Sequence, residues 1–298
     1  MKLKKSASNL TFQKLFSSMV LSLTMIACGG GDPATTTPAP TPAPLYSTRM
    51  MVQPADRIFA EPTYNASIQF AVETDPAKSV AQQSLLPGSV LLTTGPTRTV
   101  GFADFSSYLQ EALKYPNIRY TYLYDELFWT GSSIAIGKDE VETLAAAKLS
   151  HAAGLKTVVS ILPYVVLDPA FALADSNAFD IIALDLYPSM VWSGNHLGGC
   201  RYNDNLQTNL LYCSIQKLRS TGFKGEIWYV YQAFGVNTKP LDTLRAELAT
   251  QRETIAAASG FGVTGLVPFG LYLTAEQIAQ EPYLFQGHSS AIESLVRY

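Results

Sequence analysis

Short apolar runs recur along the chain at spacings that suit a parallel sheet. Each run is rich in β-branched, aliphatic or aromatic residues, which is typical of a buried strand. The predicted strands are Arg49–Gln53, Ser67–Val72, Ser89–Thr93, Arg119–Tyr124, Lys156–Leu162, Asp180–Asp185, Glu226–Gln232 and Val263–Phe269. Strands that are apolar along nearly their whole length belong to sheets that are covered on both faces.

Helical patterns occupy the segments between several of these strands. The apolar face expected for the helix between the fourth and fifth strands is Val141, Leu144, Ala145, Leu149 and Ala152. Gly154 follows at the position of a left-handed C-terminal cap. A second helix carries Leu211, Ile215 and Leu218 on one face, and a third runs from about residue 240 to residue 259.

Alternating strands and helices predict an α/β protein with a parallel sheet. Eight strands in the roughly 250 residues that follow residue 46 match a single-domain (β/α)8 TIM barrel. The alternative is a doubly wound open sheet, which is disfavoured because no glycine-rich phosphate loop follows the first strand. We therefore expect one barrel domain over residues 47–298.

Residues 1–27 have the form of a signal peptide. Lysines accompany a short apolar run, Leu15–Ala27, that is too short to persist as a membrane-spanning helix. The sequence MIACG at residues 25–29 resembles the lipobox of bacterial lipoproteins, with Met25 where leucine is usual. The resemblance implies that Cys28 becomes a lipidated N-terminus that anchors the chain to a membrane, and Gly29 favours the outer membrane. The alternative is an ordinary secretory signal with an incidental cysteine.

Residues 28–46 are expected to be a linker. Residues 29–44 read GGGDPATTTPAPTPAP and contain nothing that builds a core. Proline and threonine repeats of this kind form an extended, semi-rigid tether. The expected organisation is a signal peptide, a lipidated cysteine with its tether, and the barrel.

Charge, cysteines and missing motifs exclude several functions. The chain has 21 basic and 24 acidic residues, and residues 1–27 hold four lysines and no acid, so the mature chain has 17 basic residues against 24 acidic ones, a net charge of −7. With no basic cluster, nucleic acid is not an expected partner, and no obligate protein partner is evident. No histidine pair has metal-ligand spacing and no cofactor motif occurs, so neither metal nor cofactor is expected.

Outside the cytoplasm Cys200 and Cys213 are expected to form a disulfide, with two free thiols as the alternative.

The segment Tyr120–Trp129 (YTYLYDELFW) is the strongest candidate for a site. A strand-like aromatic run ends there in two adjacent carboxylates, Asp125 and Glu126. Unpaired acids are costly inside a strand but suit the point where a strand opens into a cleft. Tyr124 and Trp129 flank the acids and are candidates for binding a sugar through their rings.

Other candidates stand at the ends of later strands, where the chemistry of a barrel gathers. The sixth strand ends at Asp185, which Tyr187 and a long loop with Trp192 follow. The seventh strand ends at Gln232, and Tyr272 lies beyond the eighth. Asp185 is a candidate catalytic acid, and the other four are candidates for binding substrate.

With these residues in place, most of residues 47–298 resembles the glycoside hydrolase superfamily of (β/α)8 barrels. In many such barrels a glutamate at the end of the fourth strand is the general acid, so the resemblance gives Glu126 that role. Some families that use the substrate's own amide carry adjacent Asp-Glu there, which implies that Asp125 orients the amide. The chain departs from members with a nucleophilic glutamate on the seventh strand, because Gln232 stands there. Either Asp185 supplies the second carboxylate, or the substrate assists, or the protein only binds.

Glycoside cleavage needs one protonated and one ionised carboxyl group. Glu126, beside Asp125 and two aromatic residues, is expected to have a raised pKa, and Asp185 to act as base or nucleophile. The expected function is a surface-tethered glycoside hydrolase that cleaves a polysaccharide or oligosaccharide substrate. The alternatives are a non-catalytic glycan-binding or envelope-scaffold lipoprotein and another barrel enzyme, such as a lyase or esterase. Each acid also has an explanation without a catalytic role. Asp125 and Glu126 could stand at the solvated start of a loop, and Asp185 could be a buried structural acid that backbone N–H groups satisfy.

Overall fold

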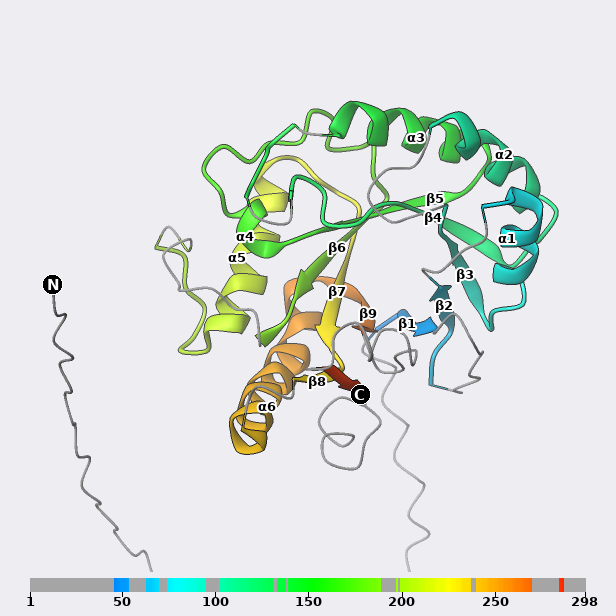
Figure 1. The fold of residues 1–298 in the computed structure, drawn as a ribbon. Helices are drawn as coiled ribbons and strands as arrows, with labels where there is room; N and C mark the ends of the chain where they lie inside the picture. Colours follow the sequence, from blue (N-terminus) through cyan, green and yellow to red (C-terminus); the bar gives the residue numbers. More distant parts are fainter. Residues whose placement is uncertain are drawn as a thin grey trace, which may run out of the picture. The chain divides into compact units, whose positions relative to one another are not determined.

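The computed structural model contains a closed barrel of eight parallel strands (Figure 1). It describes residues 46–53, 63–69, 74–94, 102–130, 133–137, 139–188, 197, 199–236, 240–269 and 284–286. Around the ring the strands are β1 (Thr48–Gln53), β2 (Ala66–Gln69), β3 (Ser89–Leu92), β4 (Ile118–Tyr124), β5 (Lys156–Ile161), β6 (Ile181–Leu186), β7 (Glu226–Gln232) and β9 (Val263–Phe269). Parallel pairing of β9 with β1 closes the ring. The predicted (β/α)8 barrel is confirmed, and each predicted strand overlaps an observed one.

Helices lie outside the ring of strands in Figure 1. They are α1 (Pro76–Gln83), α2 (Phe102–Ala112), α3 (Glu140–Ala152), α4 (Pro163–Val166), α5 (Leu206–Ser220) and α6 (Leu241–Ala258), which continues into the 3-10 helix η3 (Ser259–Phe261). Two short strands that the sequence did not predict, β8 (Phe234–Val236) and β10 (Leu284–Gln286), pair antiparallel in a separate sheet. Within the described ranges, none of the helices is both long and apolar enough to cross a membrane.

The strand residues divide into two hydrophobic layers. On β6, Ile182 and Leu184 belong to the outer cluster between strands and helices, whereas Ile181 and Ala183 belong to the cluster inside the barrel. This division follows from the strand period of two residues, which sends successive side chains to opposite faces. Continuing the same alternation by two residues places Asp185 on the inner face, at the C-terminal end of β6.

The buried face of α3 is not the predicted one. Val141 is 79% exposed and Leu149 is 36% exposed. The buried residues are Glu140, Thr143, Ala146, Ala147 and Ser150. Ser150 accepts a hydrogen bond of 2.9 Å from Thr121 on β4, and Glu140 accepts a backbone N–H at 2.8 Å. The prediction was wrong because it followed apolar residues alone, while the neighbouring elements satisfy polar groups on the buried side. Gly154, at φ +74°, does adopt the expected left-handed conformation after the helix.

Helix α5 has the predicted apolar face, since Leu211, Ile215 and Leu218 are all buried. A disulfide joins Cys200, which precedes the helix, to Cys213 within it. The bond fastens the described end of the β6–α5 connection to the helix layer. It is the pairing that the sequence analysis expected.

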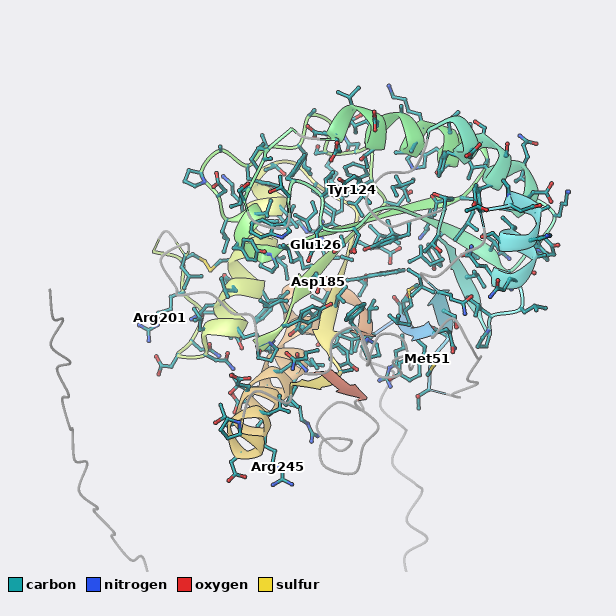
Figure 2. The ribbon with its side chains drawn as sticks, in the orientation of Figure 1. Met51, Tyr124, Glu126, Asp185, Arg201 and Arg245 are labelled. Atoms are coloured by element: carbon teal, nitrogen blue, oxygen red, sulfur yellow. A yellow bond between two sulfur atoms is a disulfide. The ribbon has the colours of Figure 1, made fainter. Side chains whose placement is uncertain are left out.

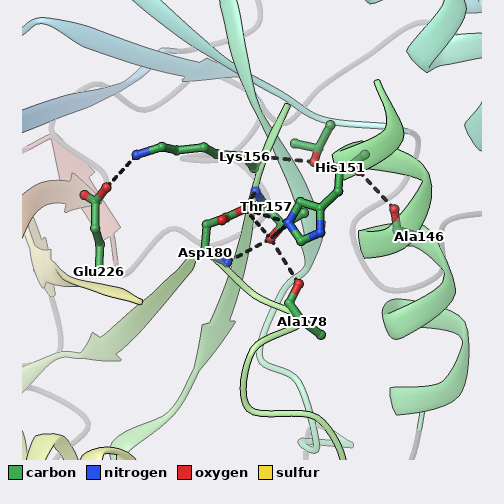
Figure 3. A network of polar contacts seen from close by, with 9 residues as sticks. Ala146, His151, Lys156, Thr157, Ala178, Asp180 and Glu226 are labelled. Atoms are coloured by element: carbon green, nitrogen blue, oxygen red, sulfur yellow. Dashed lines mark hydrogen bonds and ion pairs between the residues drawn. The ribbon is translucent and has the colours of Figure 1, made fainter. Parts of the chain in front are cut away.

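A polar network joins the starts of β5, β6 and β7 (Figure 3). Lys156 pairs with Glu226 at 2.7 Å, and Nε2 of His151 lies 2.8 Å from Oδ2 of Asp180. The same carboxylate oxygen accepts the backbone N–H of Thr157 at 2.8 Å. Burial opposes the charge of Asp180, but the hydrogen bonds from Thr157 and His151 outweigh it and lower the pKa of this carboxyl. These contacts lie at the N-terminal ends of the strands, the end of a barrel that contributes to stability.

Candidate functional site

A cavity of about 160 Å³ lies inside the barrel. Its walls are apolar side chains of several strands, among them Val52, Leu91, Val158, Ala183, Trp228 and Val230. The polar residues that line it come from strand ends and the segments that follow them: Tyr122, Asp125, Glu126, Ser160, Asp185 and Tyr187. Figure 2 shows Glu126 and Asp185 near each other in the middle of the barrel. The structure thus brings the three predicted catalytic acids to one cavity.

Asp185 is the most enclosed of these acids. It is only 8% exposed, and its Oδ1 has no hydrogen-bond partner among the described residues. The hydroxyl of Tyr187 hydrogen-bonds the same carboxyl group. Burial, and next the negative charge of Asp125 with a smaller effect of Glu126, raise the pKa of Asp185 well above its ordinary value. This setting favours the protonated form of the carboxyl group. The structural alternative, an acid satisfied by backbone N–H groups, does not account for Oδ1, which accepts no hydrogen bond from the described residues.

Asp125 reaches the cavity because of an irregularity in β4. The register between β4 and β5 shifts between Tyr122 and Tyr124, as at a β-bulge. A bulge re-aims the side chains that follow it. Tyr122 faces the barrel interior, but Tyr124 joins the outer cluster, and Asp125 then lines the cavity. The hydroxyl of Tyr122 donates to Oδ1 of Asp125 at 2.6 Å.

Glu126 lines the cavity from a constrained turn. Its φ is +53°, and Phe128 has φ +69°, which is uncommon for residues other than glycine. The turn is attached to β5 by a hydrogen bond of 2.8 Å from the backbone N–H of Leu127 to the carbonyl of Ser160. Left-handed backbone at a non-glycine residue costs on the order of 1–3 kcal/mol and persists where the surroundings enforce it, often at functional sites.

Tyrosines surround the acids. Tyr187 stacks on Phe269 with ring centroids 5.7 Å apart. Its pKa is raised well above the ordinary value, by burial first and then by the charge of Asp185. Burial and then the charges of Glu126 and Asp185 also raise the pKa of Tyr164. A raised pKa keeps both phenols neutral, and the hydroxyl of Tyr187 donates a hydrogen bond to the carboxyl group of Asp185.

Three predicted substrate-binding residues are described but do not line the cavity. The hydroxyl of Tyr124 donates to Asp139 before α3, since the bulge turns this side chain outward. Trp129 packs edge-on against Tyr164, 5.3 Å between centroids. Gln232 is fully buried, and its backbone N–H and carbonyl pair with the side-chain amide of Gln251 at 2.9 and 2.8 Å.

Other predictions lie outside the described residues. These are the candidate sugar-binding residues Trp192 and Tyr272, together with the lipidation site Cys28 and its tether. They stay predictions. Within the described part of the chain, no group of three or more His, Cys, Asp or Glu side chains is arranged to hold a metal ion.

Sequence analysis missed Tyr122, Ser160 and Trp228 as cavity residues. The alternation of strand side chains was the signal that identifies them. Ser160 stands two residues after Val158 on β5, and Trp228 two residues before Val230 on β7, so each pair shares the inner face. Trp228 is 1% exposed, and its indole N–H points to Glu226 at 3.4 Å, near the start of β7. It therefore lines the deep end of the cavity.

Replacing Asp185 with asparagine is expected to stabilise the protein at neutral pH. Because folding raises the pKa of Asp185, this acid binds more protons in the folded state than in the unfolded state. Its contribution to the free energy of unfolding therefore becomes less favourable as the pH rises from about 4, the ordinary pKa of an aspartate, through the folded-state pKa. We expect Asp185→Asn to raise the free energy of unfolding by about 1–2 kcal/mol at neutral pH. Each kcal/mol corresponds to a rise of about 2–4 °C in Tm for a domain of this size. The gain should shrink toward about pH 4, where the unfolded carboxyl also begins to be protonated.

Asp180→Asn is the matched control for this measurement, and its effect has the opposite sign. The pKa of Asp180 is lowered in the fold, so its stabilisation is present above the ordinary pKa and is lost as the pH falls through the lowered one. Thermal unfolding of the two variants and the wild type across the pH range tests both signs. An Asp185→Asn protein that is less stable than wild type at neutral pH and equally so in acid contradicts the account of the buried carboxyl.

Comparisons with known proteins identify the type of barrel. No protein-family model and no curated protein sequence matches the chain. The exo-β-1,4-mannosidase Op5Man5 from Opitutaceae bacterium strain TAV5 has a TM-score of 0.54 at 11% identity, over 84% of this chain and 59% of that one. A psychrophilic glycoside hydrolase family 10 endo-β-1,4-xylanase has a TM-score of 0.52 at 10% identity, over 85% of this chain and 97% of that one. An endo-1,4-β-xylanase from Caldicellulosiruptor owensensis has a TM-score of 0.50 at 10% identity, with the same two coverages.

These likenesses define the class of fold. The chain shares the (β/α)8 barrel fold of these enzymes. It spans 59% of the length of the mannosidase and nearly the whole length of the two xylanases. At identities of 10–11% the likeness concerns the fold, and the activity has to be argued from the site.

Proposed function

We propose that the protein is a glycoside hydrolase that cleaves a polysaccharide or oligosaccharide by carboxylate acid–base catalysis. The observation that carries the proposal is the convergence of Asp125, Glu126 and Asp185 on one cavity at the strand ends of a glycoside-hydrolase-like barrel. Glycosidic bonds are cleaved by two carboxyl groups with different protonation states. The environments of these acids are suited to that difference.

The proposed roles follow from the burial of each acid. Asp185 is almost fully enclosed and has a raised pKa, so in the free protein it holds the proton that a leaving-group oxygen needs. Glu126, partly exposed on its turn, acts as the ionised partner, either as nucleophile or as base for water. This division reverses the roles that the resemblance suggested. Asp125, bound to Tyr122, positions the substrate and holds negative charge beside Asp185.

The test is the release of new reducing ends from a panel of purified glycans, with Glu126→Gln as the inactive comparison. The configuration of the first product, followed by NMR, separates two mechanisms. Retention corresponds to carboxyl groups about 5–5.5 Å apart and inversion to about 6.5–9.5 Å. Equal rates of product release by the wild-type and Glu126→Gln proteins would refute the proposal.

A second candidate is a non-catalytic glycan-binding or scaffold lipoprotein. The observation that favours it is Gln232 at the end of β7, because an amide cannot attack a sugar carbon. Glycans that stay intact after prolonged incubation, while they still bind in the cavity, would establish this alternative.

We also propose that the protein is a lipoprotein of a bacterial outer membrane, tethered through Cys28. The support is the lipobox-like sequence at residues 25–29 and the proline- and threonine-rich segment after it. Stable anchoring requires more than one acyl chain or an additional membrane-binding signal. Metabolic labelling with a palmitate analogue should mark the wild-type chain and fail to mark Cys28→Ser. Equal labelling of both would refute the assignment.

A further inference from the structure

The deep end of the cavity, toward the N-terminal ends of the strands, has apolar walls. On β5 the lining residue Val158 stands two positions before Ser160, which also lines the cavity. On β6 Ala183 stands in the same relation to Asp185, so in both strands the apolar side chain lies deeper than the polar one. Trp228 on β7 is the register partner of Ala183, and its indole N–H lies 3.4 Å from a carboxylate at the start of that strand. The described residues at the deep end therefore offer a ligand apolar contact without a hydroxyl, an amide or a charge.

Open space at the deep end is unusual for this fold. The interior of a (β/α)8 barrel is ordinarily filled by layers of side chains, whereas here a cavity of about 160 Å³ remains among them. The side chains that line a void lose contacts that a filled core would give, so an empty cavity destabilises the fold. Ala183, the smallest of the described lining residues, stands where a larger side chain would fill the space. A ligand in this space restores the lost contacts.

The size and walls of the cavity select an aromatic ring. A cavity of about 150 Å³ that is lined by apolar side chains stays dry and binds benzene, which is a close match in volume. Trp228 and Phe269 add aromatic surface, against which another ring packs by its edge or its face. A sugar ring carries hydroxyl groups on most of its carbons, and each one that enters the deep end loses water without gaining a partner. The sugar of a substrate therefore lies above the deep end, at the level of the acids.

Asp185 marks the boundary between the two levels. It follows Ala183 by two residues on the same face, a rise of about 6–7 Å along the strand. Its Oδ1 is buried and forms no hydrogen bond with the described residues. An oxygen attached to a ring at the level of Ala183 and Trp228 can reach this atom. The boundary is thus the place for a bond between a sugar and an aromatic group.

We propose that the deep end binds a single aromatic ring on the leaving group of the substrate, so that the glycan acted on is joined to an aryl-bearing alcohol at the bond that is cleaved. This inference rests on the proposed function, whose substrate class it narrows. The sugar lies toward Glu126, which is partly exposed on its turn, and the ring lies beyond Asp185. A neutral ring that displaces water from beside Asp185 favours the protonated carboxyl group, the form that the proposed acid requires.

The reaction then divides the substrate between the two levels. The bond between the anomeric carbon and the leaving oxygen breaks, its electron pair stays on the oxygen, and the proton of Asp185 completes the aryl-bearing alcohol. Water supplies the hydroxyl group at the anomeric carbon. The other proton of that water goes to Asp185 if Glu126 has first bonded to the sugar, or to Glu126 if this residue acts as the base. The alcohol is left in the deep end, so its binding can be measured without knowing the sugar.

The first experiment measures this binding by calorimetric titration of the purified full chain. The probes are benzyl alcohol and myo-inositol, whose rings have the same number of carbons but carry no hydroxyl group in the first and one on every carbon in the second. We expect saturable binding of benzyl alcohol with a Kd of about 1 mM or tighter. Binding of myo-inositol should be at least about tenfold weaker, because its hydroxyl groups find no partners at the deep end. Equal affinity for the two probes, or no saturable binding of benzyl alcohol, overturns the proposal.

Two substitutions that fill the deep end locate the site. Ala183→Val should weaken the binding of benzyl alcohol at least about tenfold, the effect of a changed methyl group in an apolar pocket. Val158→Ile adds one methyl group from another strand and should also weaken binding, so the test does not depend on the folding of a single variant. The matched controls, Ala256→Val and Val141→Ile, lie on the exposed surfaces of α6 and α3 and should keep the wild-type affinity. Equal effects of the filling substitutions and their controls refute the site.

Hydrolysis is then tested with benzyl and methyl glycosides of glucose, galactose, mannose and xylose in both anomeric configurations. Benzyl alcohol and methanol are both ordinary alcohols, so a difference in rate reflects binding of the ring and not a more acidic leaving group. We expect kcat/KM to be at least about tenfold higher for the benzyl glycoside of the sugar that is cleaved, and Ala183→Val to remove the difference. Binding of benzyl alcohol without cleavage of any glycoside refutes the proposed hydrolysis alone. Cleavage without a preference for the benzyl glycoside refutes the aromatic leaving group alone.

Discussion

Glu126→Gln is expected to lower kcat by roughly 10²- to 10⁴-fold on the glycan that the wild-type protein cleaves, the range for losing an acid or base. Glutamine has nearly the volume and hydrogen-bonding reach of glutamate but cannot ionise. The backbone at Glu126 has φ +53°, and that constraint is the same for either side chain. Folding should therefore change little, with Tm close to wild type. The measurement pairs steady-state hydrolysis with thermal unfolding of the same preparations.

Controls separate a chemical role for Glu126 from a structural one. Glu142→Gln makes the same substitution on the exposed surface of α3 and should leave the rate unchanged. Glu126→Ala removes the side chain and leaves space for a small anion, so formate or azide should restore part of the rate if Glu126 is the ionised partner. A Glu126→Gln protein that keeps the wild-type kcat, or one that loses activity only together with its fold, contradicts the assignment.

The barrel was predictable because its signal is repeated along the chain. Each strand run carries the same apolar pattern, and the alternation on β6 places Asp185 inside by simple counting from Ile181. The face of α3 was not predictable in this way. Its buried side contains Glu140 and Ser150, whose partners come from distant parts of the chain, and no local pattern encodes those partners.

The acids of the site were predictable, but their surroundings were not. A carboxylate pair at the end of an aromatic strand marks Asp125 and Glu126 without any structure. The bulge in β4 decides that Asp125 faces the cavity and Tyr124 the helix layer, and this bulge depends on pairing with β5. The raised pKa of Asp185 likewise depends on burial and on Asp125, which lies 60 positions earlier in the chain. The pKa shift of Asp185 was therefore not predictable from the residues next to it in the sequence.

Gly265→Ala is expected to destabilise the fold and to reduce the cavity at the same time. A Cβ atom at Gly265 on β9 would lie 2.4 Å from Cδ1 of Trp228 and 2.6 Å from Nε1. The indole has little room to move, because it packs against Tyr120 at 5.5 Å between centroids and lies 3.4 Å from Glu226. Overpacking of this kind lowers the free energy of unfolding by about 1–3 kcal/mol. Each kcal/mol lowers Tm by about 2–4 °C.

Ligand affinity should fall in parallel, since the crowded side chain of Trp228 also lines the cavity. Two further proteins make the test specific. Gly260→Ala should have little effect on Tm, because a Cβ there meets no atom within 4 Å. Trp228→Phe combined with Gly265→Ala should recover stability relative to the sum of the two single changes, since the smaller ring leaves room for the methyl group. If Gly265→Ala melts at or above the wild-type temperature, or if the double variant shows no recovery, then the indole does not rest on Gly265 and the deep end of the cavity is built differently.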